Sequence, residues 1–467
     1  MLFNSFAFVV LLLITFALYY TPRLSRLQVP ILIAASLIFY SYNQPVLVLL
    51  LLASIAINIL SSYAVTYGNP KYRKLYAVLG VVLNLSVLLF FKYSPLFGRT
   101  LFRETSSIGE FLISIPLPVG ISFFTFQGIS LVVDVFKQNY FKDRELIPSS
   151  LWEHSKRTAF FISFFPQLVA GPIVKGHEFM PQIEVKKFKD IDWERCFRLI
   201  VLGYFLKMVI ADNLKEFTFW IAYPYFQGFK TMQLIGLLFG YSFQIFADFA
   251  GYSLIAIGLA KLFGYNFKDN FNFPYISTSF KEFWKRWHIS LSSFLMEYLY
   301  FPLGGNRKGK VRTYINLMLT MVLGGLWHGA AWSYAVWGTF HGLALAVERF
   351  ITDRVKLNPN RLINTLKGLM VFCFVTLAWL LFKLPEFSHV IEYFKAMSLN
   401  QGLLSGSLLL YVMLYSIPVI VYHIHYLVRE RKAYEPVRQV EYLPYGLMVF
   451  LIITNSGPAG AFIYFQF

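Results

Sequence analysis

Long apolar runs recur along the whole chain, and they constrain its fold more than any other feature. Residues 45–65 read PVLVLLLLASIAINILSSYAV and residues 75–91 read LYAVLGVVLNLSVLLFF. Each run is close to the ~20 residues that a helix needs to cross a bilayer. Only 14% of the residues are charged, whereas soluble globular chains carry about 25%. The sequence therefore predicts an all-α, polytopic membrane protein.

The first apolar runs also predict a topology. Helices are expected at 6–20, 29–43, 46–66 and 76–93. Basic residues, among them Arg23, Lys71 and Arg73, gather in the loops after the first and third helices. Because Lys and Arg collect in cytoplasmic loops, the N-terminus is predicted to lie outside. The basic segment VRERKAYEPVR, before the last apolar run, agrees with an even number of crossings, about ten, in a single membrane domain over residues 1–467.

The formal net charge is +18, but no basic domain or DNA-binding motif accompanies it. The charge is explained by the positive-inside bias and by attraction to anionic lipid headgroups. Attraction of an anionic cytoplasmic substrate is a further explanation. The two cysteines are isolated, and no metal-binding, P-loop or nucleophile-elbow motif occurs. We therefore expect no nucleic-acid partner and no metal.

Three segments do not have the pattern of simple spans. Residues 115–134 and 164–173 combine prolines and glycines with polar residues, as in IPLPVGISFFTFQGIS and FFPQLVAGPI. Irregular backbone at membrane depth persists only where protein or a water-filled cavity covers it. We expect broken or re-entrant elements at both. Residues 277–310 interleave basic and aromatic side chains, which favours a helix lying in the membrane interface, followed by the basic turn GGNRKGK.

Two histidines lie in the apolar stretch LGGLWHGAAWSYAVWGTFHG, residues 323–342. Its flanks are charged and are predicted to be cytoplasmic, so the stretch must enter the membrane and return. A tight hairpin or a pair of broken helices satisfies this condition. The backbone is expected to turn at the small residues Gly324, Gly325, Gly329 and Ala330.

His328 would then lie near the deepest point of the hairpin. Ionisable groups within membrane spans are costly and by default indicate a function. An imidazole titrates near neutral pH, as a general base must. The alternative is a structural histidine, hydrogen-bonded to a neighbouring helix. For His341 a support or packing role is expected. His288, in KRWHIS, either faces the headgroups or lies at the mouth of a cytoplasmic cavity.

Asp248 is a lone acid in the apolar segment 233–263. It either lines a cavity, hydrogen-bonds a helix end, or is paired structurally.

An ordered set of motifs covers most of residues 115–345. They are PVGISFFTFQGIS, FFPQLVAGPI, FADFAGYSLIAIG, NFPYIS, FWKRWHISLSSF, YLYFPLGGNRKG and LGGLWHGAAW…WGTFHG. The set resembles the membrane-bound O-acyltransferase family, and most of all its branch of alginate O-acetylation. The resemblance implies a helical bundle around a central funnel, pierced by a tunnel. It also implies catalysis by His328 of the WHG motif, with His288 of the WHIS motif as a second functional position.

The resemblance further implies acetyl-CoA as a cytoplasmic acyl donor. The acyl group would pass to an extracytoplasmic partner transferase or to a polysaccharide such as alginate or peptidoglycan, at the bacterial inner membrane. Trp327 and other indoles around the turn are candidate donors to an oxyanion. The groups expected near the phosphates of coenzyme A are polar or basic: Lys285, Arg286, Asn306, Arg307 and Lys308. The alternative for these residues is the ordinary positive-inside bias.

Two other functions remain open on the sequence. One is transfer of D-alanine from a carrier protein to teichoic acid, and the other is a transporter in which His328 relays protons. The chain also departs from many relatives, since Met296-Glu297 stands where they have Arg-Asp, and Leu254 where an acid often follows GYS. These departures concern the acceptor and the partner rather than the histidines.

Overall fold

The computed structural model describes residues 1–102, 106–137, 147–169, 171–355, 360–402, 407–429, 442–458, 460 and 462. Every regular element in these ranges is a helix, which confirms the expected fold class. The chain divides into two compact units. Unit 1 comprises residues 1–197 and 255–268, and unit 2 comprises residues 198–254 and 269–467. The single domain predicted from the sequence stays a prediction.

Unit 1 is built from the N-terminal helices. They are α1 (Phe6–Tyr20), α2 (Gln28–Ser41), α3 (Leu47–Tyr67), α4 (Arg73–Leu101), α5 (Ser107–Ser114), α6 (Ile121–Lys137), α7 (Leu151–Ser163), α8 (Phe165–Leu168), α9 (Gly176–Phe179) and the start of α10 (Trp193–Tyr204). Short 3₁₀ turns lie at Pro22–Leu27, Pro70–Tyr72, Met180–Gln182 and Phe188–Asp190. The first four predicted helices are confirmed, and α4 is longer than expected.

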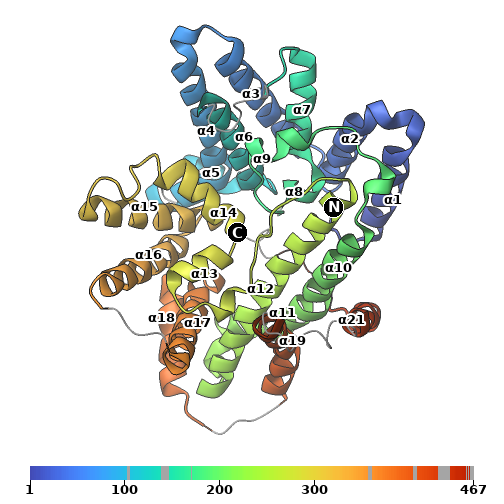
Figure 1. Cartoon of the computed structure of the whole chain (residues 1–467). Helices are drawn as coiled ribbons and strands as arrows, with labels where there is room; N and C mark the ends of the chain where they lie inside the picture. Colours follow the sequence, from blue (N-terminus) through green and yellow to red (C-terminus); the bar gives the residue numbers. More distant parts are fainter. Residues whose placement is uncertain are drawn as a thin grey trace. The chain divides into compact units, whose positions relative to one another are not determined.

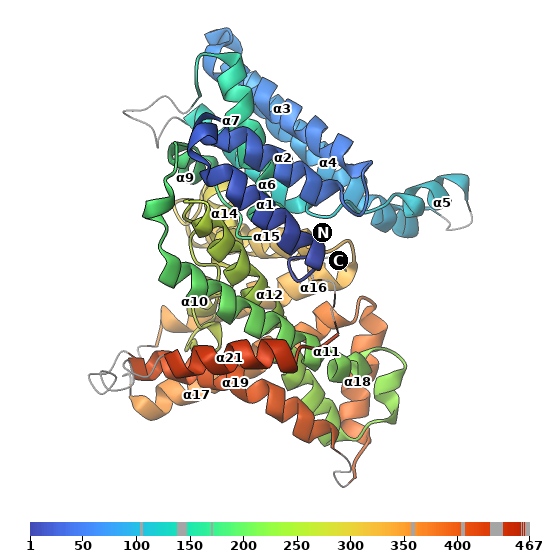
Figure 2. The ribbon, with the colours of Figure 1, turned by 90° about the vertical axis from the view of Figure 1, so that its right-hand side faces the viewer.

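The helices α3, α4 and α6 of unit 1 pack together, as do α1 and α2 (Figures 1 and 2). Asn58 of α3 and Asn84 of α4 exchange amide hydrogen bonds of 3.1 and 3.0 Å, both within the buried part of the two helices. Such bonds satisfy buried polar groups that lipid could not satisfy. They hold α3 and α4 in one register.

Unit 2 contains the remaining helices. After α10 come a π-helical segment, η5 (Phe205–Ala211), α11 (Asp212–Thr218), α12 (Thr231–Leu262), α13 (Phe280–Arg286), α14 (Ile289–Leu295), a second π segment, η9 (Met296–Tyr300), α15 (Lys310–His328), α16 (Trp332–Thr352), α17 (Arg361–Lys383), α18 (Phe387–Leu399), α19 (Leu408–Arg429) and α21 (Tyr442–Thr454). Short 3₁₀ turns lie at Phe219–Ile221, Tyr225–Gly228 and Pro274–Ile276. The last residues of α12 belong to unit 1.

Six helical stretches of the described chain are long and apolar enough to cross a membrane. They are Pro22–Ser41, Leu47–Tyr67, Pro70–Leu101, Thr231–Leu262, Arg361–Lys383 and Leu408–Val428. The helices α1 and α21 are apolar but shorter. In α12, 83% of the most apolar window is buried, against 22–44% in the other five. Thus α12 is shielded, whereas the others expose apolar faces of the kind that lipid covers. Part of the chain that would hold the predicted ten crossings lies outside the described residues, as does the basic segment 428–438 from residue 430 onward.

The irregular segments are confined more narrowly than predicted. Residues 115–120 are not helical, and Gly120 has a φ of 79°, but α6 then runs unbroken from Ile121 to Lys137. The irregular element expected over 115–134 is therefore confined to 115–120, and the prediction is wrong for residues 121–134. In 164–173 only the four-residue α8 is helical, which confirms the irregular character of this segment, although Ala170 lies outside the described residues. Residues 277–310 form three short elements instead of one helix.

The hairpin predicted at 323–342 is confirmed. Helix α15 ends at His328 and α16 begins at Trp332, and the two pack side by side (Figure 1). The turn is at Gly329–Ala331, so the expectation that the chain turns at Gly324 and Gly325 is wrong. Both residues continue α15. A side chain on Gly324 would meet the side chain of Leu295 at 2.9 Å, whereas Gly325 lets the backbone of α16 approach. A side chain on Gly325 would overlap the Tyr334 carbonyl and reach Gly338 at 3.0 Å.

We expect Gly338→Ala to destabilise the α15–α16 hairpin by about 1–3 kcal/mol, the usual cost of overpacking. The added methyl group would overlap the Met321 carbonyl oxygen, which is rigid backbone. The measurement is the midpoint of thermal unfolding in detergent. Gly446→Ala, on α21, is the matched control, because a methyl group there meets nothing within 4 Å. Equal midpoints for both variants would contradict the close packing.

Candidate functional site

His328 lies at the last position of α15, where the chain leaves the helix for an extended Gly329. Its side chain is buried among aromatic rings. The imidazole centroid is 5.2 Å from the Trp337 ring and 5.1 Å from the Phe382 ring. The centroid of the His288 ring is 6.3 Å away. The two histidines singled out in the sequence, 40 residues apart, therefore lie together in unit 2.

His288 forms a strained junction between α13 and α14. Its φ is 44° and its ψ is 55°, in the left-handed region. A non-glycine residue there costs on the order of 1–3 kcal/mol and persists only where the surrounding structure holds it. The surrounding structure is the segment 270–272, which bonds on both sides of the turn. The Asn272 N–H donates to the Arg286 carbonyl, and the Ile289 N–H donates to the Asn270 carbonyl, both at 2.9 Å.

The turn also fixes the state of the His288 side chain. Burial lowers the pKa of His288 to about 3, so the imidazole is neutral near neutral pH. Its Nδ1 lies 3.1 Å from the side-chain oxygen of Asn270. The edge of Phe249, from α12, packs on the ring at a centroid distance of 4.6 Å. The imidazole is thus held by the polar contact with Asn270 and by the apolar contact with Phe249.

The first turn of α13 is capped from another helix. Glu348 of α16 accepts hydrogen bonds from the backbone N–H groups of Phe280 and Lys281. A carboxylate at a helix N-terminus is favourable because it satisfies free N–H groups and meets the positive end of the helix dipole. The contact fastens α13, and therefore His288, to the hairpin that carries His328.

Of the side chains expected to meet coenzyme A, Arg286 is already engaged. Its Nε donates to Glu282 at 2.9 Å and its Nη1 to the Asn272 carbonyl at 3.1 Å. Burial acts to raise the pKa of Glu282, but hydrogen bonds from Thr278 and attraction to Arg286 outweigh it, so the pKa lies below its usual value. The four others, Lys285, Asn306, Arg307 and Lys308, are exposed. Their binding of an acyl donor stays a prediction.

His341 belongs to the same aromatic group but not to the same helix as His328. It is fully buried on α16, with its ring centroid 4.7 Å from Trp337 and 5.2 Å from Trp284. Trp337 thus touches both histidines. Trp327 lies 5.8 Å from His288 and 5.2 Å from His328, also by ring centroids. The support roles expected for His341 and Trp327 agree with these positions and stay predictions.

Asp248 is paired rather than alone. The Nζ of Lys207 lies 2.7 Å from carboxylate oxygens of both Asp248 and Asp212, and all three side chains are buried. Lys207 lies in the π segment η5, a rare element that often marks functional sites. Gly251 of α12 lets the backbone of η5 approach closely, since a side chain at position 251 would lie 2.8 Å from the backbone nitrogen of Lys207. The lone Lys in the apolar run FLKMVIADN was the sequence signal that would have indicated this cluster.

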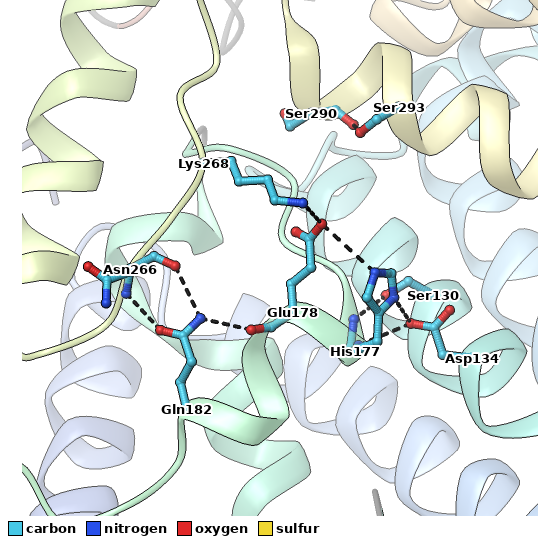
Figure 3. Close-up of polar contacts among 10 residues, drawn as sticks. Ser130, Asp134, His177, Glu178, Gln182, Asn266, Lys268, Ser290 and Ser293 are labelled. Carbon is cyan, nitrogen blue, oxygen red and sulfur yellow. Dashed lines mark hydrogen bonds and ion pairs between the residues drawn. The ribbon is translucent and has the colours of Figure 1, made fainter. Parts of the chain in front are cut away.

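A second polar cluster, in unit 1, was not predicted (Figure 3). Asp134 accepts hydrogen bonds from the backbone N–H of His177, at 3.1 Å, and from its Nδ1, at 2.8 Å. The neighbouring Glu178 pairs with Lys268 at 2.6 Å. Ser130 accepts from the Gly176 N–H. The contacts of Ser130 and Asp134 fasten the start of α9 to α6, which is a structural role.

Comparison with known proteins identifies the family of the chain. The chain is 37% identical over 385 residues to the peptidoglycan O-acetyltransferase of Helicobacter pylori, covering 78% of this chain and 73% of that protein. The sequence profile of the membrane-bound O-acyltransferase family matches residues 154–384. The chain belongs to the membrane-bound O-acyltransferase family. The matched range includes His288, His328 and His341.

Other relatives of this membrane-bound O-acyltransferase act on different polymers. A probable alginate O-acetylase of Pseudomonas aeruginosa is 36% identical over 411 residues, covering 85% of this chain and 75% of that protein. The teichoic acid D-alanyltransferase of Bacillus subtilis is 28% identical over 286 residues, covering 58% of this chain and 70% of that protein. The protein is therefore an O-acyltransferase, and the transporter considered from the sequence is not supported.

We expect Lys207→Met to destabilise the protein by about 3–5 kcal/mol, because it leaves two buried carboxylates without their cation. Unfolding in detergent, followed by heat or denaturant, measures the effect. The matched control is the triple variant Lys207→Met, Asp212→Asn, Asp248→Asn, which removes all three charges and should recover most of the loss. If Lys207→Met alone is as stable as the wild type, the ion cluster contributes nothing to the stability of the fold.

Proposed function

We propose that the protein transfers acetyl groups from cytoplasmic acetyl-CoA for O-acetylation of a cell-surface polysaccharide, alginate-like or peptidoglycan. The observation that carries the proposal is the buried pair His288 and His328, 6.3 Å apart by ring centroids, in a chain 35–38% identical to O-acetylating relatives. A paired-imidazole site in an aromatic, water-poor surrounding suits the transfer of an acyl group between oxygen and sulfur. No residue of the proposal calls for a metal.

His328 acts as the general base in this proposal. Its imidazole takes the proton from the hydroxyl group of the acceptor or relay, whose oxygen attacks the thioester carbonyl carbon. The carbon–sulfur bond then breaks, and the thiolate of coenzyme A receives the proton from the imidazolium. A positioned base of this kind contributes roughly 10²–10⁴ in rate. The products are an O-acetyl ester and free coenzyme A.

The oxyanion formed during attack needs hydrogen-bond donors. The Trp337 indole is well placed, because its ring adjoins His328 and its buried Nε1–H makes no hydrogen bond to any described residue. Trp327 is the second candidate. Fixed donors aimed at a developing negative charge are worth about 10²–10³ in rate each. His288 completes the site as a second, neutral imidazole.

The cellular setting of the proposal is the bacterial inner membrane, with the N-terminus outside. Basic side chains of the turn at 304–310 and of α13 would attract the phosphates of coenzyme A on the cytoplasmic side. Lys281, Lys285, Arg307, Lys308 and Lys310 are exposed in the structure, as a docking site for a soluble donor requires. An extracytoplasmic transferase, or the polysaccharide itself, would receive the acetyl group.

We expect His328→Ala to remain folded in the membrane and to lose at least about 100-fold of its acyl-transfer rate, because the base is gone. The assay supplies radiolabelled acetyl-CoA to the purified protein or to isolated membranes and follows coenzyme A release and the label in the polymer. His389→Ala is the matched control, since this histidine stacks on Tyr223 and pairs with Glu386 away from the site.

Polymer acetate at wild-type levels in His328→Ala would refute the catalytic assignment. A wild-type protein that releases no coenzyme A, yet transfers D-alanine from a loaded carrier protein, would establish the other acyl group instead. That alternative has its own support in the D-alanyltransferase relative.

A further inference from the structure

The Asn270 side chain lies at the centre of the His288 turn and is almost completely buried. Its Oδ1 meets three hydrogen-bond donors. The Ser290 backbone N–H lies at 3.1 Å, the Ser290 hydroxyl at 2.8 Å, and the Nδ1 of His288 at 3.1 Å. At the other end, the Asn270 amide nitrogen donates to the Ser253 hydroxyl at 3.1 Å. Every polar atom of this amide is therefore in use.

These contacts determine which end of the amide faces the histidine. The Ser290 backbone N–H can only donate, so the atom opposite it must be the amide oxygen and not the nitrogen. The same oxygen faces the Nδ1 of His288. Two acceptors at 3.1 Å would repel each other, so Nδ1 carries the hydrogen. In a neutral imidazole this places the lone pair on Nε2.

The orientation of the His288 imidazole ring is fixed as well. Asn270 is itself held by Ser253, which comes from α12, and its backbone carbonyl accepts from Ile289 just after the turn. Phe249, one turn before Ser253 on α12, packs edge-on against the imidazole. The same helix therefore supports the amide and the apolar face of the ring.

We propose that Asn270, oriented by Ser253, is a positioning residue that holds His288 as the tautomer with its hydrogen on Nδ1 and its basic nitrogen on Nε2. The inference rests on the proposed function, because it assigns His288 a role in the acyl transfer. In that role Nε2 accepts a hydrogen bond from the hydroxyl group that attacks the thioester, while His328 takes the proton of that group. Support of an imidazole by a fixed partner on its second nitrogen is a recurring way to set its tautomer and orientation.

Three variants test the assignment. Asn270→Leu keeps the size but removes both polar ends. Asn270→Asp keeps the acceptor for Nδ1 and for Ser290, and adds a negative charge. Ser253→Ala removes only the group that orients the amide. Ser242→Ala is the matched control for Ser253→Ala, because Ser242 is another buried serine of α12 and donates to Thr376 instead.

The expected pattern separates kcat from KM. Asn270→Leu should lower kcat about 10- to 100-fold, the usual effect of removing a supporting partner, with little change in the KM for acetyl-CoA. Ser253→Ala should lower kcat less, and Ser242→Ala should leave it unchanged. Asn270→Asp should restore kcat to within about tenfold of the wild type at its own optimal pH, because the acceptor is restored.

The pH profile is the readout that a merely structural role would not move. A carboxylate beside Nδ1–H stabilises the imidazolium, so in Asn270→Asp the acid limb of kcat/KM should move to higher pH by roughly one unit or more. The other charged or titratable groups around the turn are the same in every variant. They are His328 on α15, Asp248 with Lys207 beside Phe249, Asp269 next to Asn270, and Glu282 with Arg286 on α13. A shift in this variant is therefore assigned to the new carboxylate.

The proposal is overturned if folded Asn270→Leu keeps the wild-type kcat, or if Asn270→Asp keeps the wild-type acid limb. Gel filtration and the unfolding midpoint of each variant in detergent establish that it is folded. Should Asn270→Leu not fold, Asn270→Asp and Ser253→Ala decide the question alone. Failure of the proposed function looks different, since either the wild type would then release no coenzyme A or His328→Ala would keep full transfer activity. Loss of activity in His328→Ala with no effect of the Asn270 and Ser253 changes overturns the positioning role only.

Discussion

The backbone contact between α15 and α16 is the constraint on which the site depends. Where the two helices cross, Gly325 meets Gly338 and the Tyr334 carbonyl, so no side chain separates the helices. This close approach places Trp337 of one helix against His328 at the end of the other. Glu348, farther along α16, then caps α13 and so fastens His288 to the same hairpin. The site is a consequence of packing that glycine alone permits.

Much of this arrangement was predictable from the sequence. The apolar runs gave the long helices, because span length and hydropathy are set by the bilayer and not by tertiary detail. The charged flanks of 323–342 predicted the hairpin, because a stretch with both ends on one side of the bilayer must enter the membrane and return. The motifs WHG and WHIS indicated the two histidines that the structure brings together. What these features share is that each is encoded locally, within about 20 residues.

The parts that were missed depend on contacts between distant segments. Gly324 and Gly325 resembled turn residues, yet they lie within α15, because glycine serves close helix packing as well as turns. Asp248 resembled a lone acid, since its cation, Lys207, is 41 positions earlier in the chain. Asn270 carries no sequence signal for its contact with His288, 18 residues later. Pairings of this kind are decided by tertiary geometry, which periodicity and motif spacing do not encode.

The residues that build the site have a further consequence for how the protein is made. The site residues between Ser253 and His341 all belong to unit 2. The connecting stretch 255–268, which carries none of them, belongs to unit 1. A chain is synthesised from its N-terminus, and domains form in that order. His288 can reach its clamped conformation before the hairpin exists, but His328 meets Trp337 only when α16 has entered the membrane. A partly synthesised chain that ends before α16 therefore lacks the Trp337 wall of His328 and the Glu348 cap of α13, so the histidine pair gains its full surroundings only after α16 is made.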